Sequence, residues 1–137
     1  MTRIGKETFK ATPDGIPGND DLGATSGVYV WNALGFYPAV PGIAGLVFGT
    51  PMFDRATLQF AGGRTMVISR EGQGIYVQEV MLNGILYPNS WLQISKIHPG
   101  TNQVRFKMGA EPNTQRGTAP EDRPPGVPII TSPACFR

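Results

Sequence analysis

Three polar residues, Asn19, Asp20 and Asp21, lie between glycines in the segment GIPGNDDLGATSGVYVWNALG, directly before an apolar run. Adjacent carboxylates repel each other, so their position beside apolar residues indicates a specific use. One possible use is structural, because a carboxylate at a helix start accepts hydrogen bonds from free N–H groups and suits the positive end of the helix dipole. The other is catalytic, because paired carboxylates can serve as acid and as base or nucleophile in glycoside hydrolysis. Local physics alone favours the cap.

Other residues whose side chains could react or stack on a sugar give weaker signals of function. His98 is the only histidine and precedes Pro99 in a predicted loop, where no catalytic partner is evident. Trp31 and Trp91 have rings that can stack on a sugar, but the apolar surroundings of Trp31 favour burial, and Trp91 is open to either interpretation. The single cysteine, Cys135, excludes an internal disulfide and a cysteine-based metal site.

The two acids need an element that fixes them, and the sequence predicts a helix over residues 20–34. An acid can cap its start, and Gly35 fits the position just past its end. Residues 28–31 favour a strand by propensity, but their continuous apolarity indicates a buried element of either type. A single buried helix lacks a partner helix in this chain, which predicts that the chain is a fragment of a larger protein. Without such a partner we expect Val28, Val30, Trp31 and Phe36 to be exposed.

From residue 55 the hydrophobic period changes to two, which predicts strands. A glycine-containing loop at 61–63 and the pair Asn83-Gly84 predict two hairpin turns. We therefore expect about five short antiparallel strands over 55–109, preceded by a short strand near 45–48. The fold class is α+β, with a helical end at 1–44, an antiparallel β region at 45–110 and a proline-rich tail at 111–137 that is extended or disordered.

Charge and hydropathy exclude some classes of function. The 12 basic and 10 acidic residues are scattered, which argues against a nucleic-acid partner. No apolar run approaches the roughly 20 residues of a membrane span.

The segment DGIPGNDDLGATSGVYVWNALGFYPAVPG resembles the acidic motif of glycoside hydrolase family 92, whose members are calcium-dependent, inverting, exo-acting α-mannosidases. VFGTPMFDRATL, YVQEVMLNG and MGAEPNT resemble the C-terminal portion of that family in order and spacing, so the similarity covers roughly residues 10–115. The resemblance implies that the helix over 20–34 ends an (α/α) toroid, which would explain its missing partner.

The resemblance also implies site residues and partners. Asp21 corresponds to the catalytic base, Asp20 is its neighbour, and Asn19 stands where the family often has an assisting acid. The general acid and the calcium ligands are expected upstream, so the isolated chain should be inactive. The implied substrate is a terminal α-mannoside or N-glycan, the implied partner is the remainder of the parent enzyme, and the implied location is secreted, periplasmic or cell-surface. The alternative is a non-catalytic, β-rich carbohydrate-binding or interaction module.

Overall fold

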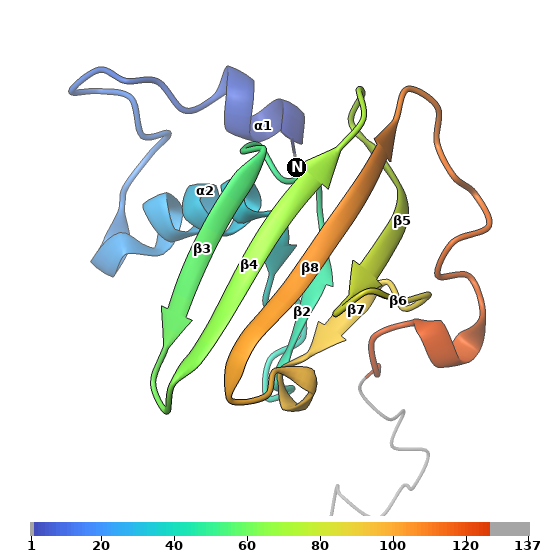
Figure 1. Ribbon diagram of the computed structural model, residues 1–137. Coiled ribbons are helices and arrows are strands. Elements are labelled where there is room, and N and C mark those ends of the chain that lie inside the picture. Colours follow the sequence, from blue (N-terminus) through green and yellow to red (C-terminus); the bar gives the residue numbers. More distant parts are fainter. Residues whose placement is uncertain (1, 127–137) are drawn as a thin grey trace, which may run out of the picture.

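Two β-sheets pack face to face in the computed structural model, which describes residues 2–126 (Figure 1). The larger sheet has the strand order β3-β4-β8-β5-β6, and the smaller sheet has the order β1-β2-β7. The larger sheet contains β3 (Arg55–Phe60), β4 (Arg64–Glu71), β5 (Tyr76–Leu82), β6 (Ile85–Leu86) and β8 (Gly100–Gly109). The smaller sheet contains β1 (Phe36–Tyr37), β2 (Gly45–Phe48) and β7 (Trp91–Gln93). This arrangement confirms the predicted α+β class.

The helices precede the sheets in the chain. A short helix, α1 (Thr2–Glu7), is followed by an irregular segment, a 3₁₀ turn η1 (Asp21–Gly23) and the main helix α2 (Ala24–Leu34). Gly35 has φ +80° and ends α2, as predicted, because a left-handed backbone is favourable for glycine. Figure 1 shows α2 on the side of β3, behind the larger sheet. None of the helices within residues 2–126 is long and apolar enough to cross a membrane.

The predicted period of two is confirmed most clearly in β8. Its inner residues alternate with exposed ones along the strand, and the inner set consists of Asn102, Val104, Phe106 and Met108. Both predicted hairpin turns are present, at residues 61–63 and at Asn83-Gly84. Asn83 and Gly84 have φ +51° and +82°, the backbone that a two-residue hairpin with the favoured twist requires.

One strand pair differs from the predicted antiparallel arrangement, because β4 and β8 are parallel. β8 lies between β4 and β5, and it pairs antiparallel with β5. The buried amide of Asn102 stabilises the turn that starts β8. Its Nδ2 donates to the carbonyl of His98 at 2.8 Å, and its Oδ1 accepts the His98 N–H at 3.1 Å. A local period of two cannot distinguish parallel from antiparallel pairing.

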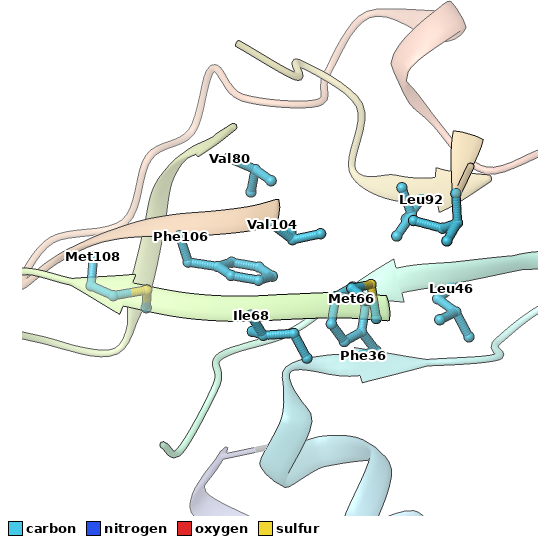
Figure 2. Packing of buried hydrophobic residues seen from close by; sticks show 10 residues of the cluster. Phe36, Leu46, Met66, Ile68, Val80, Leu92, Val104, Phe106 and Met108 are labelled. Atoms are coloured by element: carbon cyan, nitrogen blue, oxygen red, sulfur yellow. The ribbon is translucent and has the colours of Figure 1, made fainter. Parts of the chain in front are cut away.

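The core lies between the two sheets (Figure 2). The centroid of the Phe106 ring lies 5.8 Å from that of Phe36 and 5.5 Å from that of Phe48, so aromatic contacts join the sheets. The buried cluster consists of Phe36, Leu46, Met66, Ile68, Val80, Leu92, Ile97, Val104, Phe106 and Met108. Phe36 is 1% exposed, so the expectation that it would be exposed is wrong. It lies in β1 of the smaller sheet, and its ring packs against Phe106 of the larger sheet.

The described part of the tail, to residue 126, runs beside the β6–β7 connection and contains one short 3₁₀ turn, η3 (Pro120–Asp122). The Asp122 carbonyl accepts the Ser90 N–H at 2.8 Å. The Arg116 guanidinium donates to the Asn89 carbonyl at 2.6 Å and lies 5.4 Å from the centre of the Phe48 ring. Backbone and side-chain hydrogen bonds therefore attach this irregular segment to the β6–β7 connection. The remainder of the predicted tail, with Cys135, lies outside the described residues.

Candidate functional site

The three candidate residues form a tight bend that leads into α2. The backbone at Leu22 has φ +52° and that at Gly23 has φ +79°, so two successive residues are left-handed. Such a backbone is ordinary for glycine but costs a leucine roughly 1–2 kcal/mol. The Leu22 side chain is fully exposed, so contacts with other described residues do not offset this cost. A strained bend at a polar motif is typical of a functional position.

α2 begins at Ala24, with Gly23 at its N-cap position, and not at residue 20 as predicted. Asp20 nevertheless bonds to the helix start through its carboxylate. Its Oδ1 accepts the backbone N–H of Ser26, the third residue of α2, at 2.7 Å. The hydrogen bond from the Ser26 backbone lowers the pKa of Asp20 below its usual value, because the bond is stronger to the ionised carboxylate. The Thr25 hydroxyl donates to the Asn19 carbonyl at 2.7 Å and so ties the start of the bend to the helix. Asp20 therefore holds the backbone in place.

Asp21 differs from its neighbour although the two residues are adjacent. It is exposed and lies in the first position of η1. Within residues 2–126, its carboxylate takes part in no hydrogen bond and no ion pair. The Asp21 carboxylate is thus free to contact a water molecule or a ligand, whereas that of Asp20 already has a backbone partner.

A cleft of about 340 Å³ lies next to this bend, between the irregular segment and α2. Its wall contains Ser26, which bonds to Asp20, and the rings of Phe9 and Tyr29. The centroids of these two rings are 5.0 Å apart. The loop in the wall is closed by a hydrogen bond from the Lys10 N–H to the Gly15 carbonyl at 2.9 Å. The sequence interpretation missed these residues, because residues 1–19 have no period that would place them near the helix.

Other sequence candidates lie away from the bend. Trp91 is 7% exposed in β7, whereas Trp31 is partly buried and packs against the core cluster. His98 is exposed, and its backbone, rather than its ring, bonds to Asn102. In the part of the chain that the structure describes, no group of three or more His, Cys, Asp or Glu residues gathers. The bend alone, with adjacent carboxylates and one amide, does not make a complete calcium site.

α2 keeps much of its apolar surface uncovered within this chain. Only Asn32 and Ala33 of the helix are buried, whereas Val30 is 55% exposed and Tyr29 is 37% exposed. The expectation for Val30 is confirmed. Val28 and Trp31 are partly covered rather than fully exposed.

Comparisons with known proteins identify relatives. Residues 1–110 match the family model described as the glycosyl hydrolase family 92 catalytic domain. An uncharacterized secreted glycosidase of Arthroderma benhamiae is 27% identical over 125 residues, which are 87% of this chain and 16% of that protein.

Solved structures agree with the family match. The family GH92 α-mannosidase BT3965 from Bacteroides thetaiotaomicron, in complex with mannoimidazole, superposes with a TM-score of 0.83 at 31% identity over 90% of this chain. The family GH92 inverting mannosidase BT2199 from the same organism gives a TM-score of 0.79 at 31% identity over 89% of this chain. This chain spans 17% of each of those structures. Because the family model covers most of the chain, including the acidic bend, this chain belongs to glycosyl hydrolase family 92.

Proposed function

We propose that this chain supplies the general base of a glycoside hydrolase that removes terminal α-mannosides with inversion, and that Asp21 is that base. The observation that carries the proposal is the different use of two adjacent carboxylates. Asp20 is bonded to the start of α2, and Asp21 is exposed without a partner among the described residues. The family match includes this bend, and one similar structure is named an inverting mannosidase.

In the proposed step, the main requirement for the base is its position relative to the attacking water. In an inverting hydrolysis the acid and the base are about 6.5–9.5 Å apart, so that a water molecule fits between the base and the anomeric carbon. Asp21 takes a proton from that water as its oxygen attacks carbon, and a separate acid protonates the leaving oxygen. Asp20 and the Thr25 hydroxyl keep the bend rigid, so the base stays aimed. The Asn19 amide can orient the water but cannot take its proton.

The proposed reaction also needs a general acid and a calcium ion, which we place in the part of the parent enzyme outside this chain. Calcium dependence comes with the family resemblance, and calcium would bind mannose hydroxyls. The described residues do not gather its ligands, so we assign no residue of this chain to it. We therefore propose that the 137-residue chain alone does not hydrolyse α-mannosides or N-glycans. The name of the Arthroderma benhamiae relative supports a location outside the cell.

The test replaces Asp21 in a full-length family 92 mannosidase whose corresponding region is exchanged for this sequence. Asp21→Asn should lower kcat by roughly 10²–10⁴-fold with little change in KM, because proton abstraction occurs only in the transition state. The fold should lose less than about 1 kcal/mol, since Asn keeps the volume and the Asp21 carboxylate has no hydrogen-bond partner within residues 2–126. Asp20→Asn is the matched control, and its effect on kcat should be milder.

The two variants separate catalysis from capping when kcat and the melting midpoint are measured on the same samples. If Asp21 were only a structural residue, Asp21→Ala would lower the midpoint while Asp21→Asn kept normal turnover. Wild-type kcat in Asp21→Asn would remove the base assignment and favour a non-catalytic carbohydrate-binding or interaction module.

A further inference from the structure

A second cavity, of about 250 Å³, lies at the end of the larger sheet away from the acidic bend. Four parts of the chain enclose it: α1, the β2–β3 connection, the end of β4 and the β4–β5 turn. Figure 1 shows α1 at this end, where β3 begins and β4 ends. The lining residues are Lys6, Thr50, Pro51, Met52, Arg70, Gln73, Gly74 and Ile75. Two of them are cationic, and no acidic residue is among the described residues that line it.

The Arg70 guanidinium is fixed in the wall by two backbone carbonyls. It donates to the Pro51 carbonyl at 2.9 Å and to the Gly74 carbonyl at 3.1 Å. Gly74 has φ +103°, and a Cβ there would meet the Gly109 carbonyl, so only glycine can present its carbonyl in this way. Pro51 is buried, which fixes the other carbonyl. The guanidinium is therefore held in one orientation before any ligand arrives.

Arg70 keeps donors that the protein does not use. A guanidinium carries five N–H groups, and only two of them bond to the protein within residues 2–126. None of its nitrogens is both buried and unpaired, since the buried unpaired side-chain nitrogens of the described chain are those of Trp91 and Arg116. Nε, which has no hydrogen-bond partner among the described residues, is thus not buried, and the guanidinium lines the cavity.

No acid forms an ion pair with the two cations of this cavity among the described residues. The acids next to Lys6 and Arg70 in the chain are paired elsewhere, Glu7 with Arg3 at 3.7 Å and Glu71 with Arg105 at 3.4 Å. The backbone carbonyl of Asp54 accepts the Arg70 backbone N–H at 3.0 Å, but its carboxylate forms no ion pair within residues 2–126. Within residues 2–126, neither Lys6 nor Arg70 has a carboxylate within ion-pair distance. Two cations facing a concave space without an acid raise the local concentration of anions.

We propose that this cationic cavity binds a small oxyanion, namely a phosphate, sulfate or carboxylate group. A planar guanidinium with free N–H groups suits the oxygens of such a group, and a lysine adds a mobile second charge. The volume holds several water molecules at about 30 Å³ each, and so accommodates one oxyanion. The inference does not depend on Asp21, which lies at the opposite end of α2 from Gly35 and the Pro51 wall.

The test titrates the full 137-residue chain separately with inorganic phosphate, sulfate and acetate at constant ionic strength. Each titration records the melting midpoint and the amide NMR shifts of residues 50–52 and 73–75. We expect at least one anion to raise the midpoint saturably, with a dissociation constant on the order of 1 mM. Tightest binding of acetate identifies a carboxylate site, and tightest binding of phosphate or sulfate identifies a tetrahedral-anion site.

Three variants make the test specific. Lys6→Gln should weaken binding about tenfold, which corresponds to about 1.4 kcal/mol. Lys96→Gln makes the same charge change at an exposed position on η2 (Ile94–Lys96) and should leave binding unchanged. Gln73→Glu places a carboxylate in the wall at an exposed position and should abolish binding without disturbing the fold. The proposal is overturned if no anion binds saturably, or if Lys6→Gln and Gln73→Glu bind as well as the unchanged chain.

Discussion

The two packed β-sheets, which form a sandwich, and the helical end of this chain, with α1 and α2, are stabilised in different ways. Ten buried apolar residues, nine of them in the two sheets, form one continuous cluster in the sandwich. In contrast, α2 buries only Asn32 and Ala33 and leaves Val30 largely exposed. The acidic bend belongs to this second region, and individual hydrogen bonds from Ser26 and Thr25 define it rather than a core. The chain thus places its candidate base on a locally braced element, while its stability comes from a separate part.

The largest expected effect tests how much the core of the sandwich contributes to stability. Phe106 is fully buried and contacts the rings of Phe36 and Phe48, so Phe106→Ala should lower the free energy of unfolding by about 3–5 kcal/mol. Urea denaturation of both proteins measures the difference. Lys107→Ala is the control on the next residue, because its exposed ion pair with Glu79 contributes at most about 1 kcal/mol. A loss below about 1 kcal/mol in Phe106→Ala would show that the sandwich core is not the main source of stability.

The second prediction compares the two regions directly by amide hydrogen exchange. Amides of residues 104–108 should exchange only on global unfolding, because β8 is central in its sheet and buried on one face. Amides of residues 28–34 should be protected at least about 100-fold less, or the chain should self-associate through the exposed face of α2. Sedimentation on the same sample identifies self-association. A monomer with equal protection in both segments would contradict the comparison.

The smallest expected effect concerns the bond that defines the bend. The Ser26 backbone lowers the folded-state pKa of Asp20 below its usual value of 3.8. The stability that the ionised Asp20 carboxylate contributes is therefore fully present above the unfolded-state pKa. This contribution is lost as the pH falls through the lower folded-state pKa. The stability difference between the wild-type chain and Asp20→Asn should shrink as the pH falls below about 3.8.

Chemical denaturation at a series of pH values measures this difference. Asp21→Asn serves as the control, because it makes the same substitution at the adjacent residue, whose carboxylate has no partner within residues 2–126. A larger pH-dependent difference for Asp21→Asn than for Asp20→Asn would reverse the roles assigned to the two acids.

Part of the candidate site can be predicted from the sequence. The pattern of two acids before an apolar run identified Asn19, Asp20 and Asp21, because capping and catalysis both require polar residues at a helix start. The family resemblance assigned the base to Asp21, but the local pattern did not separate the roles of the two acids, since adjacent residues are equally able to cap. That distinction needed the backbone angles at Leu22 and Gly23, which direct Asp20 toward Ser26. The assignment of Asp21 as base stays a prediction.

The cationic cavity had no signal in the sequence. Lys6 and Arg70 are far apart in the chain, and neither belongs to a motif. They meet because α1 packs at Met52, where a Cβ on Gly5 would lie 2.5 Å from the Met52 methyl group, and because β4 ends beside it. Contacts of this kind depend on how elements stack, which no local pattern encodes.

By itself, the sequence determined the end of α2, two hairpin turns and the alternation of the strands, but not α1 or the start of α2. The end of α2 at Gly35, the hairpins at 61–63 and Asn83-Gly84, and the alternation along β8 follow from backbone angles and side-chain period, which are local properties. Only the tertiary structure decided which elements are neighbours. It placed β8 parallel to β4, buried Phe36 and Trp91 in the sandwich, and joined α1 to the end of β4. These choices depend on burial of apolar area between residues distant in the chain, and that energy belongs to the whole arrangement rather than to any one segment.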